Sequence, residues 1–287
     1  MYKAMNIEII CPLYNAEKYI IDLDKNTRKQ KNVEISKISY VLTESKDDTE
    51  QLLKKLNANY TKIKKEEFSH SSAREKVAIN SESDIVVFIT QDIEIRNEDW
   101  LEKLVEPIIN NEAVASYSRQ VTKFNNIEKY TRECNYPEKS ILKSKENIEE
   151  LGLKTFFFSD ASSAIKTSVY KELNGYDGKK LPINEDMYIA YKIIMSGYKI
   201  KYCANSVVWH SHKFTIREIY ERYKLTGKFF KENNYLDKFG TTGSGANLAK
   251  YILKRILQEH NFKLLFRYPF DMGARYIGMK VGKRWKI

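Results

Sequence analysis

The sequence predicts an α/β protein with a doubly wound, mostly parallel sheet, followed by a basic helical C-terminal extension. Short apolar runs alternate with helical patterns as far as residue 212, which is typical of βαβ units. Beyond that point, long helical patterns carry an excess of Lys and Arg. We therefore expect an α/β domain over residues 1–214 and an extension over residues 215–287.

The first half of the expected domain has a regular strand–helix order. The runs NIEIICP and ISKISYVLT predict buried strands over residues 6–12 and 35–43, and the pattern after the first strand predicts a helix over 16–29. Leu52, Leu53 and Leu56 fall on one face of a helix over 49–57. A short strand over 60–63 and a helix over 71–80 lead to another buried strand over 85–90.

The second half continues with a helix over 100–110 and a strand over 113–117. Residues 122–155 are polar, and we expect a flexible loop with a helix that covers a site. A buried pattern resumes at 156–158 and 161–165. A helix over 187–196 ends at Gly197 as its C-cap, and short strands follow over 198–202 and 206–210. In the extension, helices over 215–233 and 247–259 are joined by the glycine-rich residues 240–245, and a basic, apolar stretch covers 262–287.

Composition limits the class of protein. Of the 287 residues, 42% are hydrophobic and 30% are charged, which is ordinary for a globular protein. The three cysteines are scattered and lack metal-site spacing, so a reducing cytosol is the simplest compartment. The N-terminus has no signal-like segment, and no apolar run reaches about 18 residues, so we expect no membrane span.

The net charge of +11 is unevenly distributed. Residues 213–287 hold 17 Lys and Arg against 6 Asp and Glu, whereas residues 1–212 hold 32 of each sign. Because a docking segment concentrates charge in this way, the extension is the expected contact for an anionic partner.

The most informative segment is VVFITQDIE, residues 86–94. A buried strand there ends in Thr90, Gln91 and two carboxylates, Asp92 and Glu94. Ligands bind at the carboxyl ends of strands in open α/β sheets, and paired carboxylates suit a divalent cation bound to phosphate oxygens. The alternative is an ordinary acidic turn after a strand.

Glycine-rich phosphate loops are absent from the sequence. The first strand is followed by CPLYNAEKY rather than GxGxxG, and no GxxxxGK[ST] occurs, so a dinucleotide-binding Rossmann protein and a P-loop NTPase are both disfavoured. A nucleotide would therefore be held through side chains and a metal ion.

A series of short motifs, in order along the chain, resembles the family 2 inverting glycosyltransferases, which have the GT-A fold. The residues that carry this resemblance are Pro12-Leu13-Tyr14-Asn15, Thr43 to Thr49 (TESKDDT, like a D-x-S-x-D-x-T base loop), Thr90 to Glu94 (like D-x-D), and Asn184-Glu185-Asp186 (like the E-D motif). Within the family, the bacterial rhamnosyltransferases of cell-wall and capsule synthesis are most similar, through Phe68-Ser69-His70, Arg74, Thr90-Gln91-Asp92 and Val208 to His212. The resemblance covers residues 5–215.

The resemblance implies a nucleotide-sugar half over residues 1–95 and an acceptor half over 96–214. The implied nucleotide-sugar residues are Pro12, Tyr14, Asn15, Glu44, Ser45, His70, Arg74, Gln91, Asp92 and Asp160. Glu44 stands where the family has Asp, which leaves its base or ribose contact open. Arg74 offers the bidentate geometry that phosphate favours, and a solvated helix arginine is the alternative.

For the metal, the resemblance implies Mn²⁺ or Mg²⁺ held by Asp92, Glu94 and one of His210 or His212. Carboxylates suit either ion, and an imidazole ligand favours Mn²⁺. Both histidines can line one surface, because residues two apart on a strand point the same way. Glu94 replaces the second Asp of D-x-D, and this longer acid can ligate the ion directly or through a water molecule.

The catalytic residues implied by the E-D motif are Asp186 and Glu185. Displacement with inversion needs one general base and no enzyme nucleophile, and Asp186 is the expected base. Glu185 would orient the acceptor or its loop. The alternative is an acidic first turn that complements a helix dipole.

The C-terminal stretch mixes cations with apolar residues. The residues that define it are Arg255, Lys263, Arg267, Arg275, Lys280, Lys283, Arg284 and Lys286, with Phe262, Leu264, Leu265, Phe266, Tyr268, Ile277 and Trp285. This blend favours an amphipathic segment on an anionic membrane surface. Packing on the domain or on a second subunit, as in a homo-oligomer, is one alternative. Nucleic acid is another, but no nucleic-acid-binding signature is present and we expect no such partner.

The sequence thus predicts a metal-dependent inverting glycosyltransferase at the cytoplasmic face of the cell membrane. By resemblance, the favoured donor is dTDP-L-rhamnose and the acceptor is a lipid-linked saccharide of cell-wall or capsular polysaccharide synthesis. A UDP-hexose or UDP-N-acetylhexosamine donor is the first alternative. A non-catalytic GT-A-like module that binds a membrane or a partner is the second.

Overall fold

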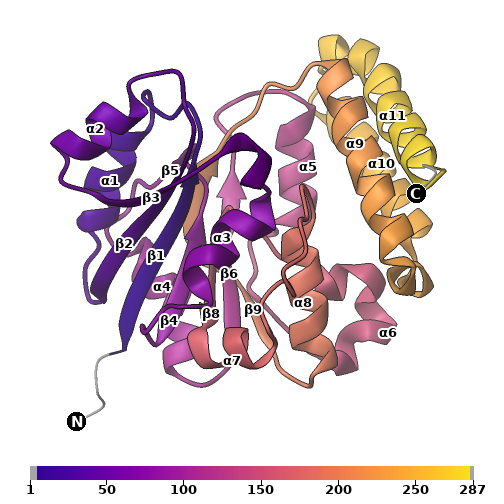
Figure 1. Cartoon of the computed structure of the whole chain (residues 1–287). Coiled ribbons are helices and arrows are strands. Elements are labelled where there is room, and N and C mark those ends of the chain that lie inside the picture. Colours follow the sequence, from indigo (N-terminus) through magenta and orange to yellow (C-terminus); the bar gives the residue numbers. More distant parts are fainter. Residues whose placement is uncertain (1–4, 285–287) are drawn as a thin grey trace.

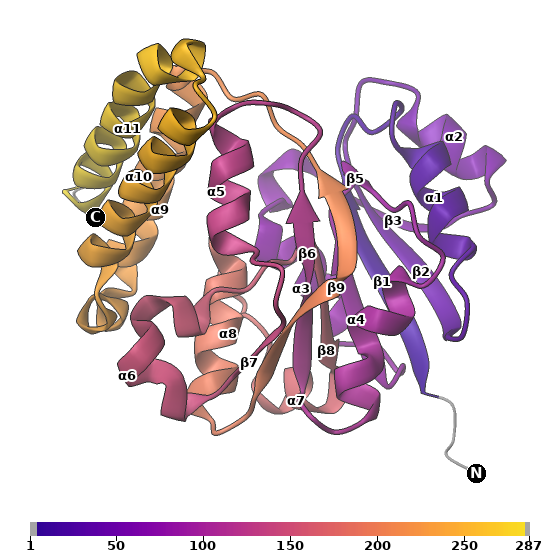
Figure 2. The ribbon, with the colours of Figure 1, turned by 180° about the vertical axis from the view of Figure 1, so that it is seen from behind.

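A nine-stranded sheet with helices on both faces forms the centre of the computed structural model, which describes residues 5–284 except for the side chains of 241, 242 and 244 (Figures 1 and 2). The strands are β1 (Asn6–Leu13), β2 (Glu34–Thr43), β3 (Asn59–Ile63), β4 (Ile85–Ile89), β5 (Ile93–Glu94), β6 (Ala115–Val121), β7 (Ile141–Lys143), β8 (Ser162–Lys166) and β9 (Ile200–His210).

The helices alternate with these strands and then continue alone at the C-terminus. They are α1 (Ile20–Arg28), α2 (Thr49–Lys55), α3 (His70–Ala78), α4 (Trp100–Ile109), α5 (Ile127–Asn135), α6 (Ile148–Leu151), α7 (Thr167–Glu172), α8 (Glu185–Met195), α9 (Ile216–Glu232), α10 (Thr241–Gln258) and α11 (Phe262–Lys283). Short 3-10 turns are η1 (Lys65–Glu67), η2 (Lys145–Asn147), η3 (Gly152–Phe156) and η4 (Asn234–Phe239).

The sheet has the order β3-β2-β1-β4-β8-β6-β9-β5, with β7 paired to β9. Its N-terminal half is parallel, because β1 pairs in parallel with β2 and β4, and β2 with β3. Strand β8 runs antiparallel to β4 and β6, whereas β9 is parallel to β6. The doubly wound α/β fold is confirmed, and the sheet is mixed beyond β4.

Two apolar clusters fill the two sides of the sheet. One joins β4 and β6 to α8 and to Phe229 and Phe230 of α9, and the other joins β1 and β4 to α1 and α4. Both sides of β4 are buried, which explains why its sequence is continuously apolar rather than alternating.

The predictions were wrong at the end of β6, for the strands near 198–210 and at the start of α10. Strand β6 continues to Val121 instead of ending at residue 117, and the two short strands expected near 198–210 are one strand, β9. A register shift between Ser118 and Arg119 lets β9 continue along β6 past residues 204–206, which have no partner in this pairing. Helix α10 begins at Thr241, so the glycine-rich residues 241–245 are helical.

Residues 122–155 are also more regular than the flexible loop we expected. They contain α5, β7 and α6. Ile127 and Tyr130 of α5 are buried against Ile252 and Ile256 of α10. Because that partner lies more than a hundred residues away, its apolar contact is not evident from the local sequence.

Helices α9, α10 and α11 pack beside α5 at one end of the sheet (Figures 1 and 2). The connection from His210 to Ile216 contains the predicted domain boundary at residue 214, which remains a prediction. Leu236 and Phe230 enter the main apolar cluster, so the extension is packed against the α/β domain. Within residues 5–284, no helix combines the length and apolarity needed to cross a bilayer.

Three glycines allow α11 and α9 to approach closely. A Cβ at Gly282 would overlap the backbone oxygen of Lys224, and one at Gly278 would lie 2.5 Å from the backbone oxygen of Tyr220. Gly227 faces Gly282 across this contact. The helix pair is therefore held by backbone proximity, which only residues without a side chain permit.

We expect Gly282→Ala to lower the free energy of unfolding by about 1–3 kcal/mol, because the added methyl group forces the two helices apart. Urea unfolding followed by circular dichroism measures the change. Gly273→Ala is the matched control, since a Cβ there meets nothing within 4 Å. It should raise stability by about 0.5–1 kcal/mol. Equal effects of the two substitutions would contradict the close packing.

Candidate active site

Residues from distant parts of the chain meet at the carboxyl edge of the sheet. The ends of β1, β2 and β4 supply Tyr14, Ser45 and Asp92, and the end of β9 supplies His210. Carboxyl ends of parallel strands share one edge, which is why these groups converge.

The loops after β1, β2 and β4 are locked to one another by hydrogen bonds. The Tyr14 backbone N–H donates to Gln91 Oε1 (2.8 Å), and Gln91 Nε2 donates to the Tyr14 carbonyl (3.0 Å). The Asn15 backbone N–H donates to Ser45 Oγ (3.0 Å), while Asn15 Oδ1 accepts from the Lys46 N–H (3.0 Å). Gln91, Asn15 and Ser45 therefore shape the loops through contacts with the backbone.

A cavity of about 440 Å³ lies beside these loops. Its lining includes Pro12, Tyr14, His70, Arg74, Gln91 and Asp92. The Lys65 ammonium lies 5.3 Å from the centre of the Tyr14 ring, and burial lowers the pKa of His70 to about 4. Glu44 is exposed and is not part of this lining. The cavity thus gathers most of the residues predicted to hold the nucleotide sugar.

Asp92, His210 and His212 form a compact cluster of candidate metal ligands. One ligand atom from each lies within 4.8 Å of the others. His210 Nε2 is 3.5 Å from Asp92 Oδ1, and His212 Nδ1 is 3.8 Å from Asp92 Oδ2. Burial lowers the pKa of both histidines, so the rings are neutral at neutral pH. One carboxylate and two neutral imidazoles fit Mn²⁺, and both predicted histidines belong to the set.

Glu94 lies outside this cluster. Its carboxylate forms ion pairs with Arg96 (2.8 Å) and with Lys123, and it is partly exposed to solvent. These two cations lower the pKa of Glu94. The structure therefore does not bring Glu94 to the metal ligands, because β5 pairs with β9 and directs this side chain to its own basic neighbours.

A second cavity, of about 330 Å³, lies on the other side of the histidines. Its lining includes Arg132, Tyr136, Phe158, Asp186, His210 and His212. Arg222 and Tyr223 of α9 and Arg275 of α11 also line it, so the C-terminal helices form one of its walls. The cluster with Asp92 thus separates two cavities, one on the predicted nucleotide-sugar side and one beside Asp186.

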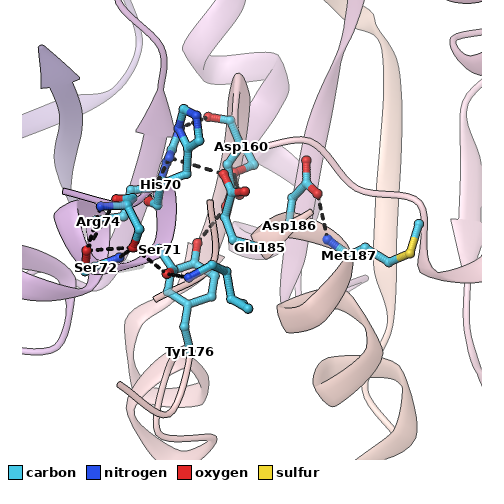
Figure 3. A network of polar contacts seen from close by, with 12 residues as sticks. His70, Ser71, Ser72, Arg74, Asp160, Tyr176, Glu185, Asp186 and Met187 are labelled. Carbon is cyan, nitrogen blue, oxygen red and sulfur yellow. Dashed lines mark hydrogen bonds and ion pairs between the residues drawn. The ribbon is translucent and has the colours of Figure 1, made fainter. Parts of the chain in front are cut away.

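Arg74 is buried in a polar network beneath the site (Figure 3). Its guanidinium donates to the His70 carbonyl (2.9 Å), to the Asp160 carbonyl (3.1 Å) and to Glu185 Oε1 (3.3 Å). Burial disfavours its charge, but the Glu185 and Asp160 carboxylates outweigh that cost and raise the pKa of Arg74. Only part of Arg74 reaches a cavity, and its main contacts join α3 to β8 and α8.

Asp160 is a buried residue whose carboxylate is held by two hydroxyl groups. Ser163 Oγ and Tyr176 OH donate to its two carboxylate oxygens (2.8 and 2.6 Å), and the residue is 1% exposed. Burial raises the pKa of Asp160. Because Asp160 is almost fully buried and each oxygen already has a protein donor, its main contacts in this structure are with the protein, and the contact with the donor sugar stays a prediction.

Asp186 faces the second cavity from the first turn of α8. Asn184, in the left-handed conformation (φ 60°), starts this helix, and Asp186 Oδ1 accepts from the Met187 N–H (2.7 Å; Figure 3). Burial, together with the nearby Glu185 and Asp160 carboxylates, raises the pKa of Asp186 well above its ordinary value. A half-buried carboxylate of raised pKa beside a cavity is suited to proton abstraction.

Comparison with known proteins identifies the family. Residues 8–173 match the model "Glycosyl transferase family 2". The O-antigen chain rhamnosyltransferase RfbN of Salmonella typhimurium is 34% identical, over 98% of this chain and 91% of that protein. WbaN of Salmonella anatum, an O-antigen chain rhamnosyltransferase, is 32% identical over 97% and 89%. The chain belongs to glycosyl transferase family 2.

Solved structures agree with the fold of this glycosyltransferase. S. aureus TarS in complex with UDP-GlcNAc is 15% identical, with a TM-score of 0.58 over 98% of this chain and 92% of that one. The mannosyltransferase PcManGT from Pyrobaculum calidifontis, in complex with GDP-Man and Mn²⁺, is 14% identical, with a TM-score of 0.57 over 100% and 77%. The predicted GT-A fold, family and glycosyltransferase class are confirmed.

Sequence reasoning missed several residues of the candidate site. Gln120 contacts His210, and Arg132, Arg222 and Tyr223 line the cavity beside Asp186. Gln120 follows the rule that identified Asp92, a polar side chain near the end of a buried strand. It was overlooked because the polar residues 118–120 made the strand appear to end at residue 117.

Proposed function

We propose that this family 2 glycosyltransferase is metal-dependent and inverting, and that it transfers L-rhamnose from dTDP-L-rhamnose to a saccharide hydroxyl. The observation that carries the proposal is the cluster of Asp92, His210 and His212 between two cavities, with Asp186 in the second. The rhamnosyl donor is supported by RfbN and WbaN, whose names describe O-antigen chain rhamnosyltransferases and which match nearly the whole chain.

In the proposed reaction, Asp186 accepts the proton of the acceptor hydroxyl. The hydroxyl oxygen forms a bond to the anomeric carbon of the donor, and the bond from that carbon to the diphosphate breaks. The electron pair leaves with the nucleoside diphosphate, so the anomeric configuration inverts in one displacement. Glu185 forms an ion pair with Arg74, and this contact supports a positioning role for Glu185 beside the base.

Asp92, His210 and His212 would hold the divalent cation, Mn²⁺ or Mg²⁺. When bound, such an ion offsets the negative charge that develops on the departing diphosphate. The two imidazoles favour Mn²⁺ over Mg²⁺, which prefers oxygen ligands. On the nucleotide side, Tyr14 offers an aromatic face at the cavity wall, with Pro12 and His70 nearby.

The first alternative keeps the mechanism and changes the donor to a UDP-hexose or UDP-N-acetylhexosamine. The similarity to TarS in complex with UDP-GlcNAc concerns the fold and leaves this alternative open to test.

A panel of donors tests the proposed function. Purified protein is offered dTDP-rhamnose, UDP-glucose, UDP-galactose and UDP-N-acetylglucosamine with Mn²⁺, and nucleoside diphosphate release is followed with and without EDTA. We expect release from dTDP-rhamnose that EDTA abolishes. Release from a UDP-sugar alone would contradict the rhamnosyl donor, and release that EDTA leaves unchanged would contradict metal dependence.

Asp186→Asn should reduce turnover by roughly 10²–10⁴-fold and leave donor binding intact, because only the proton acceptor is lost. Turnover of the wild type should fall as the pH falls through the raised pKa of Asp186, since the base acts when deprotonated. Because the charge of Arg74 lowers that pKa, Arg74→Gln should move the acid limb to higher pH. Kinetics against pH measure both effects.

Glu150→Gln removes an exposed carboxylate of α6 and serves as the control for loss of a negative charge. It should keep the wild-type pH profile. An Asp186→Asn enzyme with wild-type turnover would exclude Asp186 as the base.

We further propose that α11 rests on the anionic surface of the cell membrane, at its cytoplasmic face. The proposed acceptor there is a lipid-linked saccharide of O-antigen, cell-wall or capsular polysaccharide synthesis. An apolar stripe runs along the helix: Phe262 (75% exposed), Phe266 (76%), Phe270 (56%), Ile277 (54%) and Val281 (37%). Lys263 and Lys280 are exposed beside it, and the one acidic residue of α11, Asp271, is buried. An apolar face flanked by cations is complementary to an anionic bilayer surface.

Some residues of the predicted membrane segment are not available for this contact. Leu264 is buried, and Arg275 is buried in ion pairs with Asp271 (2.7 Å) and Glu128 (2.8 Å). Arg255 pairs with Glu133 (3.0 Å). Trp285 and Lys286 lie outside the described residues. The stripe therefore replaces the broader segment as the proposed membrane contact.

Replacing Phe262, Phe266 and Phe270 by Ser should weaken binding to phosphatidylglycerol-containing vesicles by at least about tenfold, because each Phe contributes up to about 3 kcal/mol when buried. Cosedimentation measures the binding. Leu225→Ser, at an exposed apolar position of α9, is the control and should bind like the wild type. Absence of vesicle binding, with a concentration-dependent dimer instead, would favour the second-subunit alternative.

A further inference from the structure

Gln120 is buried beside the metal-ligand cluster and forms part of the wall of the cavity beside Asp186. It is 3% exposed and lies opposite Val208 in the pairing of β6 with β9. His210 follows two residues later on β9 and so points to the same side of the sheet. The Gln120 side chain is therefore fixed against the His210 ring by the register of two strands.

Every polar atom of the Gln120 side chain has a partner. Oε1 accepts from Arg132 Nη1 and lies 2.8 Å from His210 Nδ1, while Nε2 donates to Ser159 Oγ (2.7 Å). Arg132 is 8% exposed and lines the cavity beside Asp186. These contacts hold the amide in one orientation.

The chemistry of Arg132 fixes the proton on His210. A guanidinium can only donate, so the Gln120 atom that faces Arg132 must be the carbonyl oxygen. The same oxygen then faces His210 Nδ1, which must carry the hydrogen of this neutral ring. His210 Nε2 is left with a lone pair, and this is the nitrogen that lies 3.5 Å from Asp92 Oδ1 and 2.7 Å from His212 Nε2.

The alternative tautomer, with the hydrogen on Nε2, would block cation binding by His210. With its hydrogen on Nε2, His210 could donate directly to the Asp92 carboxylate, and a proton would take the place of a cation. With the hydrogen on Nδ1, no proton lies between His210 Nε2 and Asp92 Oδ1, and in the metal-free protein the Nε2 lone pair accepts from the neutral His212 Nε2–H (2.7 Å), which a cation can replace. This tautomer leaves His210 Nε2 and the Asp92 carboxylate as ligands for a cation that accepts electron pairs.

We propose that Gln120 is a positioning residue that holds His210 in its Nδ1–H tautomer, and that Arg132 sets the orientation of Gln120. The inference rests on the proposed metal site and names the residues that prepare it before the ion arrives. Hydrogen-bond partners of metal-binding histidines typically change metal affinity by 10–100-fold when they are removed.

Calorimetric titration of Mn²⁺ into the full chain, without donor, tests the inference. Gln120→Leu removes the acceptor and should weaken Mn²⁺ binding by about 10–100-fold. Gln120→Glu keeps an oxygen that accepts from both Arg132 and His210, so it should retain binding within a few-fold of the wild type. Arg119→Leu, on the opposite face of the same strand and paired with Glu138, is the matched control and should bind like the wild type.

The outcomes separate the inference from the metal site itself. If the wild type binds Mn²⁺ and Gln120→Leu binds it equally well, the positioning role is overturned while the metal site stands. If the wild type binds no Mn²⁺, the metal site and the inference fall together. Weak binding by both Gln120→Leu and Gln120→Glu would overturn the requirement for an acceptor.

A measurement on the wild type covers the case in which Gln120→Leu does not fold. The chain has four histidines, so long-range ¹H–¹⁵N spectra of their rings are simple to resolve. His210, identified by its absence in His210→Asn, should show the Nδ1–H pattern in metal-free protein. An Nε2–H pattern would overturn the inference.

Discussion

The ion pair between Arg74 and Glu185 joins the two halves of the site. Arg74 belongs to α3 in the predicted nucleotide-sugar half, whereas Glu185 begins α8 in the predicted acceptor half, and the Asp160 carbonyl before β8 is the third partner. Removing one member of a buried pair leaves an uncompensated charge, at a cost of about 3–5 kcal/mol. The same contact lies one residue from Asp186, so the orientation of the proposed base depends on it.

Other polar side chains at the carboxyl edge of the sheet form hydrogen bonds with other parts of the protein. Gln91 holds the backbone of Tyr14, Ser45 holds that of Asn15, and Gln120 holds His210. In the sequence, Gln91 and Ser45 resemble substrate ligands because they are polar and follow strands, whereas Gln120 lies within β6. In the folded chain they keep neighbouring loops and rings in place, which leaves Asp92, His212 and Asp186 to face the cavities.

The C-terminal helices also form part of the candidate site. Gly227 and Gly282 let α9 and α11 approach closely, and this pair places Arg222, Tyr223 and Arg275 in the wall of the cavity beside Asp186. The opposite face of α11 carries the apolar stripe. One helix pair thus links the cavity proposed for the acceptor to the surface proposed to rest on the membrane.

The sequence by itself determined the α/β fold, the family and the positions of Asp92, Asp186, His210 and His212. Strand ends and motif order are local properties of the sequence, so they can be predicted without knowing which residues will contact one another in the folded chain. The tertiary structure alone decided that Glu94 pairs with Arg96 and Lys123, that Gln120 reaches His210, and which face of α11 is covered. An apolar or polar side chain does not specify its partner, because that contact depends on strand register and on the packing of helices far apart in the chain.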